Sequence, residues 1–103
     1  MALSMLGRAT ASFSGDFDTA REMVDRAAAL NPNSFRAWEE RGWTYLAMGQ
    51  PEEAIRSFER RIRLSPFDPL LFSTFAGMSA AFIGLGRFDE AVSAAKKAID
   101  SAA

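Results

Sequence analysis

Three short stretches of the chain repeat one pattern, and their spacing constrains the fold more than any other feature. GDFDTA begins at Gly15, GQPEEA at Gly49 and GRFDEA at Gly86, so the intervals are 34 and 37 residues. Each stretch has Gly first, Pro or an aromatic residue two positions later, then an acidic residue, and Ala five positions after the Gly. A period of this length is typical of repeat proteins, in which each unit is one supersecondary element that buries its apolar face against its neighbours.

The middle copy, residues 35–68, has the apolar spacing of two helices. The apolar or small residues that recur at helical intervals are Trp38, Gly42, Tyr45 and Leu46, and then Ala54, Ile55, Phe58, Ile62 and Leu64. Between the two groups, Gly49 suits a left-handed helix end and Pro51 suits a first helical turn. The pattern predicts a helical hairpin with a tight turn.

The remaining breaks are marked by Pro in LNPNS and LSPFDP, because Pro cannot continue a helix. Ser34 and Asp68 follow as the predicted N-caps of the next helices. We therefore expect six helices, at about residues 2–13, 17–30, 35–48, 52–64, 69–84 and 88–100. No long segment shows the two-residue alternation of a strand. The predicted fold class is all-α.

The middle copy resembles a tetratricopeptide repeat. Its W, G, Y, A, F and P positions are occupied by Trp38, Gly42, Tyr45, Ala54, Phe58 and Pro66. The first copy keeps the pattern at Ala20, Ala27 and Pro32, and the third keeps it, three residues later, at Phe75, Ser79, Phe82 and Ala91. The resemblance implies a single domain of three helical hairpins, with repeats at about 1–34, 35–68 and 69–103. Its six antiparallel helices would form a right-handed superhelix.

The three extra residues of the longer interval lie in FDPLLFSTF, because Pro32 to Trp38 is six positions and Pro66 to Phe75 is nine. With Asp68 as the cap and Pro69 as the first helical residue, the fifth helix is predicted to gain nearly one turn at its start. Its predicted length is about 24 Å, at 1.5 Å per residue.

Arg61 departs from the repeat pattern, because the neighbouring copies have Ala27 and Ala98 at the equivalent position. A long cationic side chain there has two explanations. It either extends to solvent from a looser junction or pairs with an acid.

The family commonly binds a segment of a partner protein on a concave surface formed by the first helix of each pair, so the resemblance implies such a site here. Trp43 lies about 140° around the helix from Trp38, so the two rings cannot face the same core. Trp43 is therefore either an aromatic anchor for a partner or a ring packed over the adjacent helix. Ala80 is in register with Trp43 in the third copy.

Further candidate site residues lie on the same predicted helices as Trp43 and Ala80. Arg36, Glu39 and Glu40 share one side of the third predicted helix and either contact a polar partner or form a solvated face. The small residues Ala76, Ala80 and Gly84 form a stripe that permits close helix approach, within the array or by a docked helix.

Composition argues against several other functions. The chain has 12 basic and 13 acidic residues, which gives no general attraction to nucleic acid. It has no Cys and no His, so thiolate chemistry, imidazole bases and the commonest zinc ligands are excluded. We expect no catalytic residues, no metal site and no cofactor. The longest apolar run, residues 70–85, is shorter than the roughly 20 residues of a membrane span, so we expect no membrane segment.

The junction LSPFDPLLF is similar to repeat regions that follow bacterial class III adenylate or guanylate cyclase domains or winged-helix regulators. This resemblance implies a cytoplasmic bacterial setting. It also offers an alternative function, as a regulatory or assembly region of a larger signalling protein whose catalytic part would lie elsewhere. The chain ends in DSAA without the polar capping helix of most arrays. We therefore expect a fragment of a longer protein that self-associates through its terminal helices.

Overall fold

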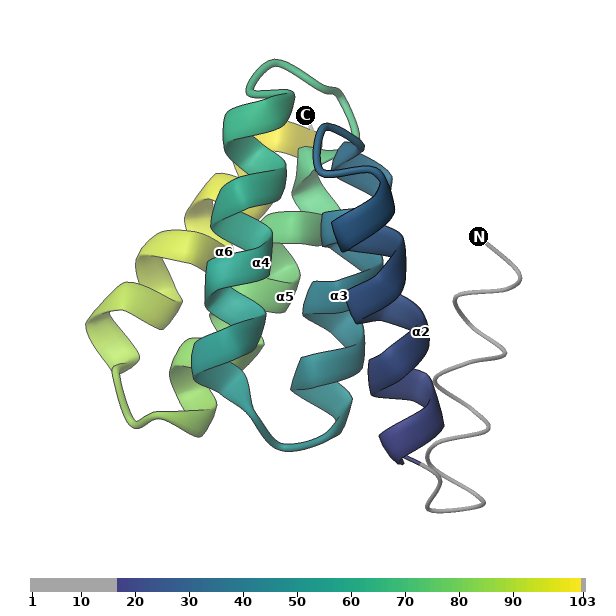
Figure 1. Cartoon of the computed structure of the whole chain (residues 1–103). Helices are drawn as coiled ribbons and strands as arrows, with labels where there is room; N and C mark the ends of the chain where they lie inside the picture. Colours follow the sequence, from purple (N-terminus) through teal and green to yellow (C-terminus); the bar gives the residue numbers. More distant parts are fainter. Residues whose placement is uncertain (1–16, 103) are drawn as a thin grey trace.

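The computed structural model describes residues 17–102, which form five α-helices (Figure 1). The helices are α2 (Phe17–Leu30), α3 (Phe35–Ala47), α4 (Pro51–Leu64), α5 (Leu71–Gly84) and α6 (Phe88–Ala102). Each begins and ends within two residues of its predicted bounds, and the all-α fold class is confirmed for this part of the chain. The helix predicted at 2–13 lies outside the described residues.

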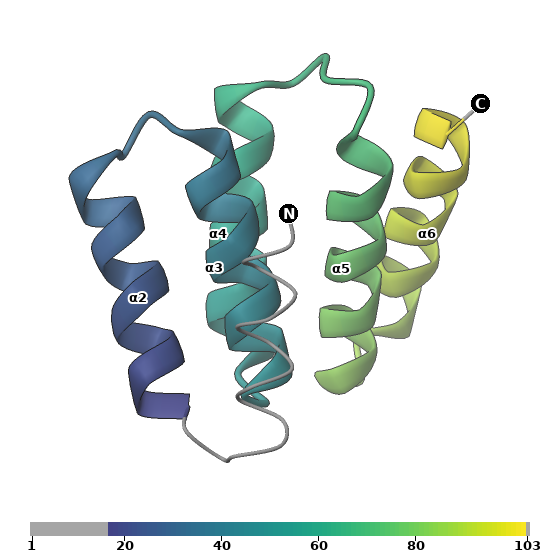
Figure 2. The same cartoon turned by 90° about the vertical axis from the view of Figure 1, so that its right-hand side faces the viewer.

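Consecutive helices pack side by side in chain order, and α3 also contacts α5 (Figure 2). The pairs α3 with α4 and α5 with α6 are antiparallel hairpins, and the second hairpin is stacked on the first. This stacking is the arrangement that a helical repeat array requires, because each hairpin buries its apolar side on the next.

The two hairpin turns have the same backbone structure. Gly49 and Gly86 both have positive φ angles, of 76° and 73°, which non-glycine residues rarely adopt. In each turn the N–H after the glycine donates to a carbonyl in the last turn of the preceding helix, from Gln50 to Tyr45 at 2.9 Å and from Arg87 to Phe82 at 2.9 Å. The predicted role of these stretches as turns is confirmed for the second and third copies. The glycine of the first copy, Gly15, lies outside the described residues.

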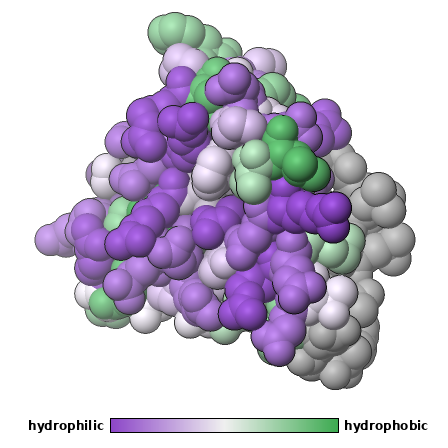
Figure 3. All heavy atoms as spheres, viewed as in Figure 1, coloured by the Kyte–Doolittle hydropathy of each residue, from purple (hydrophilic) through white to green (hydrophobic). Residues whose placement is uncertain are grey.

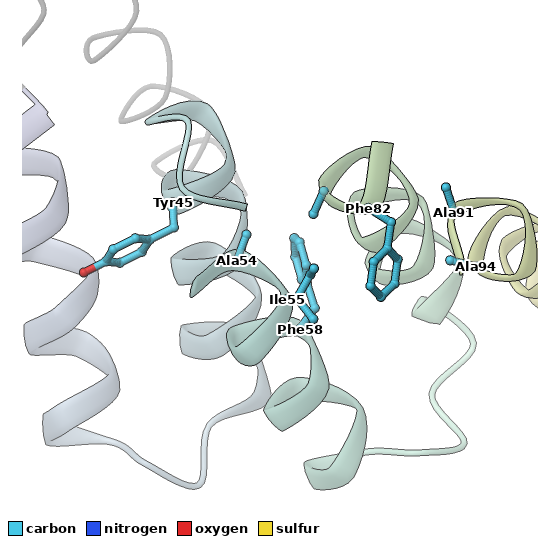
Figure 4. Close-up of a cluster of buried hydrophobic side chains, with 8 residues drawn as sticks. Tyr45, Ala54, Ile55, Phe58, Phe82, Ala91 and Ala94 are labelled. Carbon is cyan, nitrogen blue, oxygen red and sulfur yellow. The ribbon is translucent and has the colours of Figure 1, made fainter. Parts of the chain in front are cut away.

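The core lies between the two hairpins, as Figure 4 shows. Its buried residues are Tyr45, Ala54, Ile55, Phe58, Ala81, Phe82, Ala91 and Ala94. Phe58 and Ala54 are fully buried, and Ala91 is buried at the position in α6 equivalent to Ala54. The two alanines that the repeat pattern places at equivalent positions are therefore both core residues. Tyr45 points instead toward α2 (Figure 4).

The start of α5 differs from the prediction. Asp68 and Pro69 lie in the preceding loop, and α5 begins at Leu71, so its length is about 21 Å at 1.5 Å per residue. From Pro66 to Leu71 is five positions, against three from Pro32 to Phe35, so two of the extra residues lengthen the loop and only one lengthens the helix.

The side chain of Asp68 explains this difference. Its carboxylate accepts a hydrogen bond from the backbone N–H of Leu70 at 2.7 Å and pairs with Arg61 at 3.4 Å. These contacts hold a turn before the helix and tie it to α4. Ser34, by contrast, caps α3 as predicted, accepting from the Ala37 N–H at 3.3 Å.

Candidate partner-binding surface

Glu39 of α3 is the centre of a polar network that joins three helices. Its Oε1 accepts hydrogen bonds from Arg61 and Thr74, and its Oε2 accepts from the indole of Trp43 at 2.8 Å and from Ser73 at 3.0 Å. A carboxylate has about four acceptor sites. All of them are therefore occupied by donors from α3, α4 and α5, and Glu39 acts as a link between helices.

Arg61 is buried, with 2% of its side chain exposed, and it pairs with both Glu39 and Asp68. Its guanidinium also lies 4.5 Å from the ring centroid of Phe35. The second explanation for this departure from the repeat pattern is thus confirmed, because the cation pairs with acids and does not extend to solvent. Removing one member of a buried pair leaves an uncompensated charge, which is costly.

Trp43 lies across the junction between α3 and α5. Its ring packs edge-on against Phe58, with centroids 5.6 Å apart and planes at 76°. A Cβ atom built on Gly77 of α5 would be 3.1 Å from the Trp43 ring. This is the geometry expected of inter-repeat packing. The side chain remains half-buried, and its role as an anchor for a partner stays a prediction.

The other predicted site residues lie on exposed parts of α3 and α5. Arg36 is exposed and Glu40 is half-buried, and neither side chain makes a hydrogen bond or ion pair with any residue of 17–102. Ala80 is exposed on α5. The structure connects Glu39 and Trp43 directly, whereas the contribution of Arg36, Glu40 and Ala80 to a binding surface stays a prediction.

An exposed apolar stripe follows one side of α5 and is only partly evident from the sequence. Its members are Phe72, Ala76, Ala80 and Ile83, which we call the α5 stripe. Phe72 is 42% exposed and Ile83 is 56% exposed. The spacing of four, four and three residues is the signal that the sequence carries. Ala76 and Ala80 are exposed among residues 17–102, and the choice between packing within the array and a docked helix stays a prediction.

A second polar cluster joins α2 to α3 and α4. Arg41 donates to Asp25 at 2.9 Å and to Ser57 at 2.7 Å, and the Tyr45 hydroxyl lies 3.0 Å from both Asp25 oxygens. Burial, followed by donation to Asp25, raises the pKa of Tyr45 above 10.0. The contacts are all internal, so the cluster fixes helix positions.

The face that carries α4 and α6 in Figure 1 is mostly polar (Figure 3). Among residues 17–102, no group of three or more His, Cys, Asp or Glu side chains is arranged to hold a metal ion. None of the described helices has the length and apolar character needed to cross a bilayer.

MamA recurs among the solved structures that are similar to the chain. A crystal structure of MamA is 28% identical to the chain, with a TM-score of 0.76, covering 91% of this chain and 53% of MamA. Another MamA structure is 24% identical, with a TM-score of 0.77, and covers 95% of this chain and 56% of its own. The structure of a MamA mutant is 22% identical to the chain, with a TM-score of 0.77. The match covers 99% of this chain and 72% of the mutant chain. The chain spans about half the length of the first two MamA chains.

No curated protein sequence matches the chain. Family models described as tetratricopeptide repeat match residues 8–84 and residues 75–103. The first match alone covers most of the chain, and it includes the hairpin turn at Gly49 and the buried Phe58. The chain therefore belongs to the tetratricopeptide repeat family.

Proposed function

We propose that the chain is a protein-interaction module that binds an apolar segment of another protein on the side of α5 that carries the α5 stripe, next to α3. The observation that carries this proposal is the exposure of Ile83 and Phe72 together with two alanines along one side of a helix. A helix that is apolar on all sides is normally buried. Membership of a family that typically mediates protein–protein interactions supports the same conclusion.

The small side chains of Ala76 and Ala80 would let a partner helix or extended segment approach the α5 backbone closely. Trp43 would form the adjacent wall on α3, held in place by its hydrogen bond to Glu39. Glu39 itself would act through this positioning and not by direct contact. Arg36 and Glu40 would provide polar contacts at the margin of the surface.

The test uses Ala80→Glu, which places a charge in the middle of the α5 stripe without removing an internal contact. A library of peptides displayed as amphipathic helices is selected against the wild-type chain, and the affinity of the selected peptides is measured for both proteins. We expect at least a tenfold loss, because burying an unpaired carboxylate is unfavourable. The control is Ala29→Glu, the same substitution at an exposed position of α2. Equal affinity of all three proteins, or no selected peptide, would contradict the proposal.

Trp43→Ala separates the two interpretations of that ring. Because the ring packs on Phe58, we expect this variant to lose stability, measured by urea denaturation, as well as affinity. Lost affinity with an unchanged free energy of unfolding would instead assign Trp43 solely to contact with the partner.

The setting within a larger bacterial signalling protein, and its cytoplasmic location, stay predictions. They rest on the LSPFDPLLF junction, whereas the solved structures compared above are those of MamA. Sequencing the DNA upstream of the region that encodes this chain tests the signalling setting directly. That prediction requires a cyclase or winged-helix domain to be encoded there.

A further inference from the structure

The outer side of α6 carries a second exposed apolar row. Phe88, Val92 and Ile99 are 63%, 54% and 70% exposed, and Ala95 lies between them. We call these four residues the α6 seam. Their spacing of four, three and four residues is that of the a and d positions of a coiled coil. An adjoining side of α6, about 100° around the helix from the seam, is already used, because Ala91 and Ala94 are buried in the core.

The repeat shows what kind of element covers such a row. A shift of 37 residues places Val92, Ala95 and Ile99 on Ile55, Phe58 and Ile62 of α4. Ile55 and Phe58 are buried, and the Phe58 ring lies against α5 at Gly77. The equivalent side of α4 is therefore covered by a helix. On α6, no helix in residues 17–102 covers these side chains.

We infer that the α6 seam binds the α6 seam of a second copy of this chain, with the two helices antiparallel about a two-fold axis. Phe88 then lies opposite Ile99 of the second copy, and Val92 lies opposite Ala95. Large side chains at the ends of the seam meet large ones, while the small alanine faces Val92. A surface that matches itself in this way forms a closed dimer.

Charge beside the seam favours this arrangement and this register. Asp89 and Lys96 flank the seam on the same side of α6, both are exposed, and neither pairs with another residue of 17–102. The antiparallel two-fold arrangement brings each Asp89 beside Lys96 of the other copy. Shifting the two helices by one seam layer toward their C-termini would place Ala95 opposite Ile99 of the other copy. That register would bring Lys96 against Lys96. A parallel pair would bring Lys96 beside Ala91. Complementary charges contribute mainly to the choice among such arrangements.

The first experiment measures the mass of the full chain by sedimentation equilibrium over a range of concentrations. We expect a dimer for the wild type and a monomer for Val92→Glu, whose helical circular dichroism should be unchanged because Val92 is exposed. Ser93→Glu is the matched control, since it adds the same charge one residue away on a side of α6 that does not face the seam, and it should remain dimeric. A monomeric wild type, a dimeric Val92→Glu variant, or open-ended assemblies would overturn the inference.

A charge exchange tests the register. Asp89→Lys should weaken the dimer at least severalfold, and the double variant Asp89→Lys with Lys96→Asp should restore it, because the two pairs are then reversed. Failure of the double variant to recover the wild-type dimerisation constant would overturn the antiparallel register. Val92→Glu should leave peptide binding to the α5 stripe intact, so the two proposals can fail separately.

Discussion

The ring of Phe58 occupies the space that a side chain at Gly77 would need. A Cβ atom at Gly77 would lie 2.6 Å from the Phe58 ring, and one at Gly42 would lie 2.5 Å from it. Phe58 thus fits between α3 and α5 because both helices have a glycine at the point of contact. This relationship sets how closely the second hairpin packs on the first.

Gly77→Ala should lower the free energy of unfolding by about 2 kcal/mol, although Ala normally favours a helix over Gly by about 1 kcal/mol. The added methyl group would force the fully buried Phe58 ring to move. Urea denaturation followed by circular dichroism measures the change. Gly84→Ala is the control, because a methyl group at Gly84 would lie 3.8 Å from its nearest neighbour, Pro51, and no loss is expected. The prediction fails if both variants are equally stable.

Glu39→Gln should cost about 3 kcal/mol, because it leaves the buried Arg61 without one of its two acids and places an amide N–H₂ among donors. Glu40→Gln, on the same helix, should change stability by less than about 0.5 kcal/mol. Chemical denaturation of both variants provides the comparison. A small effect of Glu39→Gln would show that the network does not hold the three helices together.

Tyr45 is the one tyrosine of the chain, so the absorbance of tyrosinate reports it alone. Burial and donation to Asp25 raise its pKa above 10.0. Because the folded pKa exceeds the unfolded one, stability from this group is complete below pH 10 and is lost as the pH rises through the folded pKa. We expect the absorbance midpoint to lie higher in the native chain than in urea. Equal midpoints would exclude the Tyr45–Asp25 contact.

Asp68 should give the opposite pH dependence. Donation by the Leu70 N–H, together with the charge of Arg61, holds the pKa of Asp68 below its ordinary value of 3.8. Its contribution to stability is therefore present above that pH and is lost as the pH falls through the folded pKa. Asp68→Asn should be less stable than the wild type at neutral pH, and the difference should shrink below about pH 4. A constant difference across this range would argue against the loop contact.

The order of the helices and their turns could be predicted from the sequence because the signals are local. Gly49 and Gly86 close a helix through their own backbone angles, and Pro51 starts the next helix through its fixed φ. Such features act within a few residues, so they do not depend on the rest of the fold. Ala54 and Phe58 could likewise be assigned to the core from their place in the repeat.

Only the tertiary structure decided which side chains remain free for a partner. The helical position of Glu39 is compatible with a solvated acid, yet its partners Arg61, Ser73 and Thr74 are 22 to 35 residues away. The start of α5 also depends on a tertiary contact. The ion pair of Asp68 with Arg61 helps to hold a turn in a segment that was predicted to be helical. The exposure of the α5 stripe and the α6 seam also depends on which neighbouring helix covers each side. Helical periodicity places residues on a common side, but the packing of other helices determines whether that side is buried.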